Sequence, residues 1–332
     1  MYSEEDLNNA VKQDIFKQSS VDNFRQFIDK SKSTNRVDEE NFKLIGSFND
    51  IFVVIACLML LFSSAWVLNS IQPHSGNIVF PIIAWGLSEF FVRKRKMSLP
   101  AIVLLIAFIG GIYYLCMSLL NDTLNMSTAI AITATVSTFG AYLHWLRFKV
   151  PITIAAGSVS FIGFLTALSL SIFPAMIDYL LSILLFFGII IFILAMAWDY
   201  ADMERVTYKS DVAFWLHLTA APLIIHPIFS MIGLLEGNNS ISSMVIAIVL
   251  YIFMSLISIA IDRRAFMVSS LAYVLYAISN ILETYGDISY SFALTGVLIG
   301  TTLLLLSAYW HQTRSVLLNL LPKSINQYLV QI

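Results

Sequence analysis

The stretch IFVVIACLMLLFSSAWVLN, residues 51–69, contains no charged side chain. An apolar run of about 20 residues is long enough for an α-helix to cross the hydrocarbon core of a bilayer. Similar runs recur almost to the end of the 332-residue chain, of which 58% is hydrophobic and 12% is charged. Soluble domains carry about 25% charged residues, so the composition predicts a protein whose main solvent is lipid.

The apolar runs predict ten spans. They lie at residues 51–69, 77–92, 99–120, 125–145, 150–172, 176–197, 211–234, 241–261, 265–284 and 290–310. The second is the shortest and contains Pro81 and Glu89, and Glu89 stands four residues before Arg93, a spacing that favours an ion pair on a helix. The predicted fold class is therefore all-α, a polytopic transmembrane helical bundle.

Lys and Arg side chains gather between alternate spans, as expected of loops that remain in the cytoplasm. The clusters are Arg93-Lys94-Arg95-Lys96, Arg147 with Lys149, Arg205 with Lys209, Arg263-Arg264, and Arg314 with Lys323. The other loops between the spans contain no Lys or Arg. We therefore expect both termini to be cytoplasmic and the protein to lie, multi-pass, in the inner (plasma) membrane.

The chain divides into three predicted parts. Residues 1–48 form a cytoplasmic helical hairpin and linker, 49–310 the transmembrane bundle, and 311–332 a cytoplasmic interfacial amphipathic tail. Ser3 with Asp6 resembles a capping box that begins the hairpin. Because the first 50 residues lack a basic stretch followed by an apolar core, we expect no cleavable signal peptide.

Several classes of function receive no support. The net charge of −2 gives no basic surface for nucleic acid. Cys57 and Cys116 lie in apolar runs, where a disulfide framework or a thiolate metal site is not expected. The sequence contains no phosphate-binding loop, kinase signature or hydrolase elbow. We assign no catalytic residue, no cofactor and no metal, and the expected surroundings are the lipid bilayer.

Charged residues gather before the seventh span. Asp199, Asp202 and Arg205 follow one another at intervals of three, which would place them on one face of a helical turn. The first interpretation is a loop whose charges neutralise each other, and the second is a gate at the inner face. Ser210 and Asp211 come just before the apolar run and are predicted to cap the helix.

The seventh span itself contains His217, Pro222 and His226, preceded by Asp211 and Trp215. An imidazole in hydrocarbon needs a partner, and Pro222 can kink the helix and free a backbone carbonyl. Each histidine either makes a structural hydrogen bond between helices or serves as a proton relay, a substrate contact or a metal ligand, although a metal site would need further ligands from other spans. The second alternative predicts a polar interior site formed by these five residues and reached from the inner side.

The block Ser210-Asp211-Val212-Ala213-Phe214-Trp215-Leu216-His217, continuing to Ala221-Pro222 and His226-Pro227, is the most distinctive part of the chain. With Trp198-Asp199, Arg205 and an amino-terminal hairpin from Leu7 to Phe27, it resembles a group of uncharacterised bacterial polytopic inner-membrane proteins. These proteins combine a short helical hairpin with about ten spans. The resemblance implies a topology and a location, and it implies no activity.

Three functions are compatible with these features. The leading hypothesis is a transporter or other solute-handling protein with a polar site around the kinked seventh span. The second is a membrane-anchored sensor or assembly factor whose hairpin binds a cytoplasmic protein partner, and the third is an intramembrane enzyme. A transporter predicts a water-filled cavity that reaches His217, whereas an anchor predicts histidines packed without water.

Overall fold

The computed structural model describes residues 10–11, 13, 15–24, 48–203, 205, 207–233, 240–286, 290–322 and 329. The chain forms two compact units, residues 1–42 and 43–332. In the first unit, residues 18–24 are helical and Val21 is buried. The rest of the predicted hairpin, including the proposed cap at Ser3, lies largely outside the described residues.

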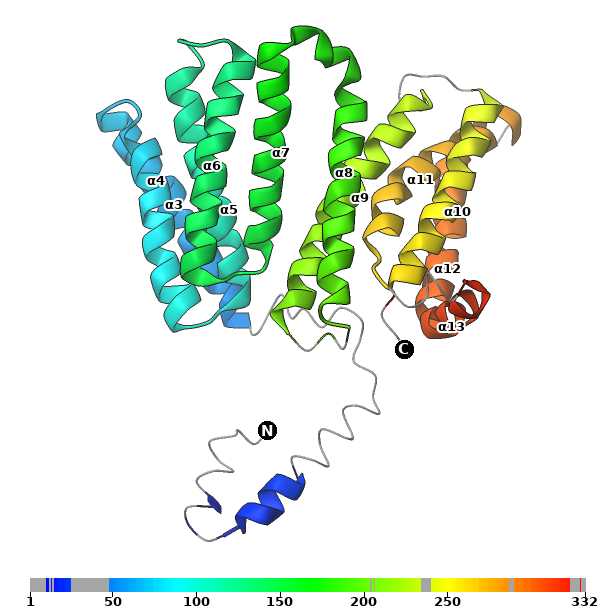
Figure 1. The fold of residues 1–332 in the computed structure, drawn as a ribbon, viewed down its shortest axis with the longest axis horizontal. Helices are drawn as coiled ribbons and strands as arrows, with labels where there is room; N and C mark the ends of the chain where they lie inside the picture. The colour runs from blue at the N-terminus through cyan, green and yellow to red at the C-terminus, as the bar shows by residue number, and fades with distance from the viewer. Residues whose placement is uncertain are drawn as a thin grey trace. The chain divides into compact units, whose positions relative to one another are not determined.

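The described part of the second unit is helical, and ten of its helical segments are long and apolar enough to cross a membrane (Figure 1). These segments are α3 (Phe48–Ile71), α4 (Ser75–Ser88) with the π-helix η1 (Glu89–Lys94), α5 (Ser98–Leu120), α6 (Met126–Phe148), α7 (Ile152–Ile172), the 3₁₀-helix η2 (Pro174–Tyr179) with α8 (Leu180–Tyr200), α9 (Tyr208–Met231), α10 (Ile241–Ile261), α11 (Ala265–Gly286) and α12 (Ser291–Ala308). They coincide with the ten predicted spans to within a few residues. The prediction of an all-α, multi-pass membrane protein is confirmed.

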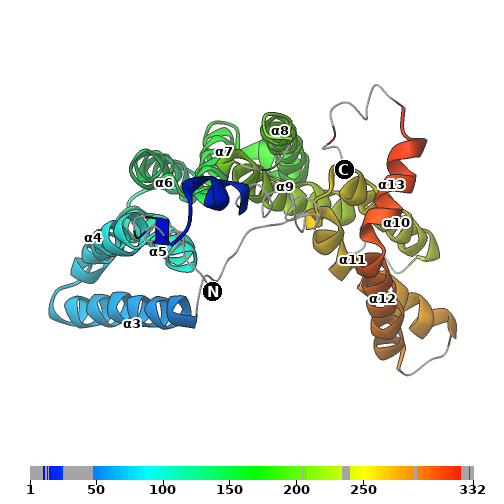
Figure 2. The ribbon, with the colours of Figure 1, turned by 90° about the horizontal axis from the view of Figure 1, so that it is seen from below.

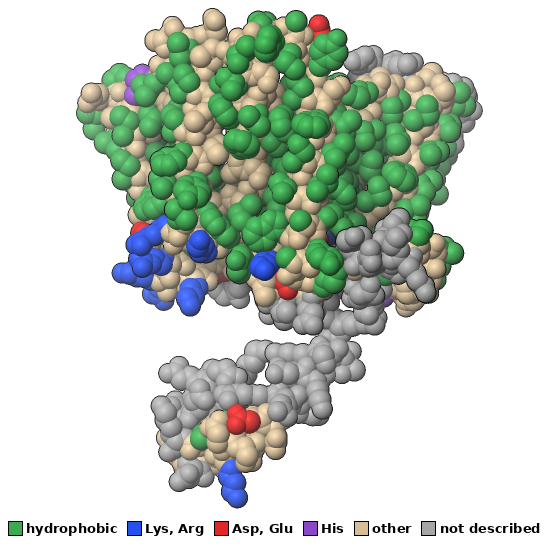
Figure 3. Space-filling view, viewed as in Figure 1, with side chains coloured by type: hydrophobic (Ala, Val, Ile, Leu, Met, Phe, Trp, Pro, Cys, Tyr) green, Lys and Arg blue, Asp and Glu red, His purple; other side chains and the backbone are tan. Residues whose placement is uncertain are grey.

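Successive spans run in opposite directions, so the turns that contain Lys and Arg share one end of the bundle (Figure 1). Hydrophobic side chains cover the middle of the visible face, and basic side chains gather at its lower end (Figure 3). The predicted pair of Glu89 and Arg93 is present at 3.3 Å. Glu89 also accepts a hydrogen bond from Arg147 Nε at 2.5 Å, which ties α6 to η1. We call this end the basic end.

Helix α9 lies among α7, α8 and α11 and is the most buried of the spans (Figure 2). One of its faces is almost entirely composed of buried small or branched apolar side chains, including Ala213, Leu216 and Ile225. On α8, Gly188 faces this helix so closely that an added Cβ would lie 2.9 Å from the Leu223 carbonyl carbon. At this position α8 and α9 approach so closely that no side chain larger than that of glycine fits without a shift.

A shorter helix, α13 (Trp310–Leu320), follows α12 at the basic end and contacts α10 (Figure 1). At 11 residues it is too short to cross a bilayer. Polar residues share it with apolar ones, and Trp310, Arg314 and Leu318 are its buried positions. The carboxyl tail predicted from residue 311 thus begins as a helix that packs on the bundle.

Candidate functional site

Asp199, in the last turn of α8, binds two other elements. Its Oδ2 lies 2.8 Å from His217 Nε2 on α9, and its Oδ1 accepts a hydrogen bond of 2.6 Å from an Arg263 guanidinium nitrogen. All three side chains are buried. The same guanidinium donates to the carbonyl and hydroxyl oxygens of Ser210 at 3.3 and 3.2 Å. One carboxylate therefore holds together α8, α9 and the turn between α10 and α11.

Asp202 and Thr207 together satisfy the amino terminus of α9, where the Thr207 hydroxyl also accepts a hydrogen bond from the Lys209 N–H at 3.3 Å. Asp202 Oδ2 accepts hydrogen bonds from the Thr207 N–H and hydroxyl at 2.9 and 2.7 Å, and from the Ser210 N–H at 3.3 Å. The helix begins at Tyr208, with Thr207 as its cap residue. The prediction that Ser210 and Asp211 cap this helix is wrong, because a carboxylate from the preceding turn satisfies its first N–H groups and lets the helix start earlier.

Arg205 makes a separate ion pair with Asp262, the residue that ends α10. Its guanidinium donates to Asp262 Oδ2 at 2.8 Å, and the other carboxylate oxygen accepts a hydrogen bond of 2.9 Å from Trp310 Nε1. Arg314 Nε lies 3.6 Å from that oxygen. Burial lowers the pKa of Arg205 from its ordinary value, and the negative charge of Asp262 opposes that shift. This pair anchors α13 to the bundle.

We call a set of connected side chains the inner polar network: Asp199, Asp202, Arg205, Ser210, His217, Asp262, Arg263, Trp310 and Arg314. Its charged members are the three carboxylates of Asp199, Asp202 and Asp262 and the three guanidinium groups of Arg205, Arg263 and Arg314. Nearly every member is buried, and the half-buried Asp211 of α9 interacts electrostatically with Arg263 and Asp202. Because an unpaired buried charge is expensive, each member holds its partners in a fixed position.

His217 and His226 do not share a site. The His217 side chain is 0% exposed, and Phe192 lies against its ring at a centroid distance of 5.6 Å. His226 is exposed, and its Nδ1 lies 2.8 Å from the Tyr273 hydroxyl oxygen. Pro222, between them, lies on the exposed side of α9, which continues through it as a helix.

Two further sequence candidates also stand apart from His217. Trp215 and Asp211 are half-buried residues of the first two turns of α9. An open gate would expose its charged side chains to solvent. Asp199 and Asp202 are instead buried, and Arg205 is paired with Asp262. The functional roles of these residues remain predictions, whereas their structural contacts are now defined.

A large cavity lined by described residues lies elsewhere, between α3, α4 and α5. Its volume is about 800 Å³. Its walls are Leu58, Phe62, Ala65, Trp66, Asn69 and Ser70 of α3, Asn77 and Phe80 of α4, and Val103, Ile106, Ala107, Gly110, Gly111 and Tyr114 of α5. Phe62, Trp66, Ile106 and Tyr114 are also exposed to the surroundings of the bundle. We call this cavity the α3–α5 groove.

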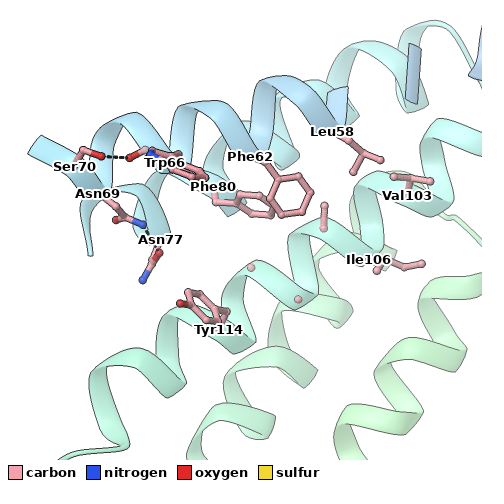
Figure 4. Close-up of a pocket in the computed structure, with 14 residues that line it drawn as sticks. Leu58, Phe62, Trp66, Asn69, Ser70, Asn77, Phe80, Val103, Ile106 and Tyr114 are labelled. Carbon is pink, nitrogen blue, oxygen red and sulfur yellow. Dashed lines mark hydrogen bonds between the residues drawn. The ribbon is translucent and has the colours of Figure 1, made fainter. Parts of the chain in front are cut away.

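The groove is polar at one end and apolar at the other (Figure 4). At the polar end the Gly76 N–H donates to Asn69 Oδ1 at 2.8 Å, Asn69 donates to Asn77 at 2.9 Å, and Asn77 donates to Ser118 at 3.3 Å. Tyr114 lies at the same end (Figure 4). The remainder of the lining is aliphatic or aromatic, and no lining residue is charged.

Sequence reasoning missed this groove. The available signal was weak: Asn69 and Asn77 flank the first loop at the end opposite the Lys and Arg clusters, inside otherwise apolar runs. Gly110 and Gly111 occur on α5, and an added Cβ at Gly110 would meet no atom within 4 Å. The open space beside Gly110 depends on where α3 lies, which its own sequence does not specify.

The described residues contain no group of three or more His, Cys, Asp and Glu side chains that could hold a metal ion. Buried polar side chains are concentrated in the inner polar network. The space large enough for a ligand lies in the α3–α5 groove. Comparison with known proteins adds no identity: no family model matches the chain, and no curated protein or solved structure matches it.

Proposed function

We propose that this multi-pass membrane protein is a solute-handling protein whose ligand occupies the α3–α5 groove. The groove itself is the observation that supports the proposal. Its volume of about 800 Å³ falls within the roughly 300–1,000 Å³ of small-molecule sites in proteins. Its lining also has the usual composition of such sites, with many apolar and aromatic side chains and a few polar groups at one place.

The ligand site that we propose is not in the seventh span, where the sequence predicted a polar site. A solute that is transported across a membrane needs a binding site that it can enter. His217 does not offer one, because it is fully buried against Asp199 and Phe192. The groove, by contrast, has exposed walls at Trp66 and Tyr114. In this proposal the inner polar network holds α8 to α11 rigid while α3 and α5 bind the ligand.

The location we propose is the inner membrane of a cell, with the basic end in the cytoplasm. Arg93 and Arg147 both pair with Glu89 at one end of the spanning unit, and Lys and Arg are retained on the cytoplasmic side during insertion. The polar end of the groove, at Asn69, Asn77 and Tyr114, then faces the opposite side.

The test is to identify what the protein retains when it is purified in mild detergent. Wild type, Gly110→Leu and Gly86→Leu are denatured, and the released compounds are identified by mass spectrometry. An added Cβ meets no atom within 4 Å at either glycine, but only Gly110 lines the groove. Gly86→Leu is therefore a matched control with the same change on a neighbouring helix.

We expect one class of compound in wild type and Gly86→Leu that is lost from Gly110→Leu, because the new side chain projects into the groove and obstructs it. Identical contents in all three preparations would contradict a ligand site in the groove. Mass spectrometry identifies whatever compound is released, so the comparison detects a polar solute as well as a lipid.

A non-transporting anchor is the second candidate, and one observation favours it. His217 is 0% exposed and is held by Asp199, the arrangement expected if the spans serve as a rigid support. An anchor predicts that wild type releases no groove-dependent compound. The same extraction experiment therefore separates the two functions.

A further inference from the structure

We propose that the α3–α5 groove binds a lipid from one leaflet of the bilayer. The head group of this lipid is uncharged and carries hydroxyl groups, as in a diacylglycerol or a glycolipid. This inference rests on the proposed function and specifies the chemical class of its ligand. Three properties of the groove lead to it: its length, the order of its polar and apolar walls, and the absence of charge from its lining.

The length of the groove matches one leaflet of a bilayer. On α3 the lining extends from Leu58 to Ser70, and on α5 it extends from Val103 to Tyr114. At 1.5 Å per residue these segments are about 18 and 17 Å long. Half of a hydrocarbon core of about 30 Å is about 15 Å, so the groove accommodates an acyl chain from the membrane surface to the midplane.

The order of the walls matches the order of groups in a lipid. Asn69, Asn77 and Tyr114 lie together at the end away from the basic clusters, where a head group would lie (Figure 4). Phe62, Ile106 and the other apolar walls continue from there toward the middle of the bundle. A soluble polar solute would leave most of this apolar wall without a partner, whereas a lipid tail covers it.

The polar end offers neutral hydrogen-bonding groups. Each asparagine amide has two N–H donors, and the bonds from Asn69 to Asn77 and from Asn77 to Ser118 use one donor of each. The Tyr114 hydroxyl adds a donor and acceptor on the facing helix. Hydroxyl and carbonyl groups suit such partners, whereas a phosphate would be expected to select Arg or Lys, and neither lines the groove.

The experiment uses two photoreactive lipids with the same diazirine-bearing acyl chain, a diacylglycerol and a phosphatidic acid. Each is included in phosphatidylcholine vesicles that contain the full-length protein, and labelled peptides are quantified after irradiation. Four single variants are compared with wild type: Gly110→Leu with its control Gly86→Leu, and Tyr114→Phe with its control Tyr113→Phe. Tyr113 is an exposed neighbour on α5 that does not line the groove.

We expect the diacylglycerol probe to label α3 and α5 in wild type, Gly86→Leu and Tyr113→Phe, and labelling to be lost in Gly110→Leu. Removing the Tyr114 hydroxyl should weaken labelling roughly two- to tenfold, the effect of one hydrogen bond. The phosphatidic acid probe should label α3 and α5 less than the diacylglycerol does. Tyr114→Phe removes one exposed hydroxyl, so the fold is expected to survive it.

Three results would overturn the inference. Undiminished labelling of Gly110→Leu would mean that only the lipid surrounding the protein is being labelled. Equal labelling by both probes, unaffected by Tyr114→Phe, would mean that the head group is not recognised. Absence of labelling on α3 and α5 of the wild-type protein by the diacylglycerol probe would mean that no such lipid enters the groove. If extraction yields a groove-dependent compound that is not a lipid, this inference fails while the proposed function stands.

Discussion

The inner polar network and the α3–α5 groove show two different uses of membrane helices. In α9, which contributes His217 and Ser210 to the network, 56% of the most apolar stretch is buried inside the protein, against 17% in α3, which forms a wall of the groove. The mean hydropathy of the same stretches has the opposite order, 1.6 for α9 and 2.7 for α3. The more polar helix is thus enclosed by protein, and the more apolar one lies at the surface of the bundle.

This difference has a physical origin. A polar group in hydrocarbon is destabilised unless another group forms a hydrogen bond or ion pair with it, so His217 and its neighbours on α9 are surrounded by other helices. Apolar side chains gain little from contact with protein instead of lipid tails, because both are apolar. Helix α3 contacts α4 and α5 and still leaves a groove beside α5, with hydrogen bonds from Asn69 to Asn77 and from the Gly76 N–H to Asn69 at its polar end. Variants in the two regions test this contrast, in order of decreasing expected effect.

The largest effect should follow Asp199→Asn. This change leaves the buried Arg263 guanidinium without its carboxylate, a kind of loss that costs about 3–5 kcal/mol of unfolding free energy. Unfolding in detergent, followed by heat or denaturant, measures the cost. Asp178→Asn is the control, because Asp178 is exposed at the opposite end of the same span. Equal stability of the two variants would show that the network is not a structural core.

Trp310→Phe should have the next largest effect. Phenylalanine keeps a smaller aromatic ring but has no N–H to donate to Asp262, and a hydrogen bond to a charged group contributes about 1.5–3 kcal/mol. Hydrogen exchange of α13 should rise as well, because Trp310 holds that helix to α10. The same change at Trp66, which is 79% exposed in the groove wall, should alter stability by less than about 0.5 kcal/mol. A larger loss at Trp66 would reverse the contrast.

Alanine at two glycines compares packing in the two regions directly. Gly188→Ala puts a Cβ 2.9 Å from backbone and side-chain atoms of α9, and overpacking of this kind costs about 1–3 kcal/mol. Gly110→Ala meets open space, and since alanine favours helix by up to about 1 kcal/mol, this variant should be neutral or slightly more stable. Thermal unfolding of both variants checks the pair. A destabilised Gly110→Ala would indicate that the groove is closed.

The smallest effect should come from Glu89→Gln at the surface of the basic end. Its contacts with Arg93 and Arg147 are exposed, and such pairs are screened by salt. We expect a small loss of thermal stability at low ionic strength that disappears at about 1 M salt, where the Debye length is about 3 Å. A loss that is independent of salt would assign this pair to the core instead.

The ten spans could be predicted because the apolar runs that form them are local in the sequence. The same holds for the Glu89 to Arg93 pair, which lies within one helical turn. The network could not be assembled in this way, since Asp199 and Arg263 are 64 residues apart, and Arg263 was informative in the sequence only as a marker of topology. The block from Ser210 to His217 drew attention to the correct helix, but its partners on α8 and in the α10–α11 turn carry no pattern of their own.

The groove escaped prediction for a different reason. Its walls are ordinary apolar residues, and what makes it a cavity is the separation of α3 from α5 beside Gly110. The resemblance to bacterial inner-membrane proteins also remains a prediction, as does the role of residues 1–48 in binding a cytoplasmic partner. The sequence therefore identified the polar residues that need partners, but it could not identify the cavity between α3 and α5.

We propose that the ligand occupies the α3–α5 groove and that the region around His217 is closed. Electron cryo-microscopy of the wild-type protein in nanodiscs that contain diacylglycerol would reveal both regions. We predict elongated non-protein density along Phe62 and Ile106, ending in a polar head beside Asn69 and Tyr114, and no such density beside His217. An empty groove closed by α3, or a solute bound at His217, would contradict this proposal.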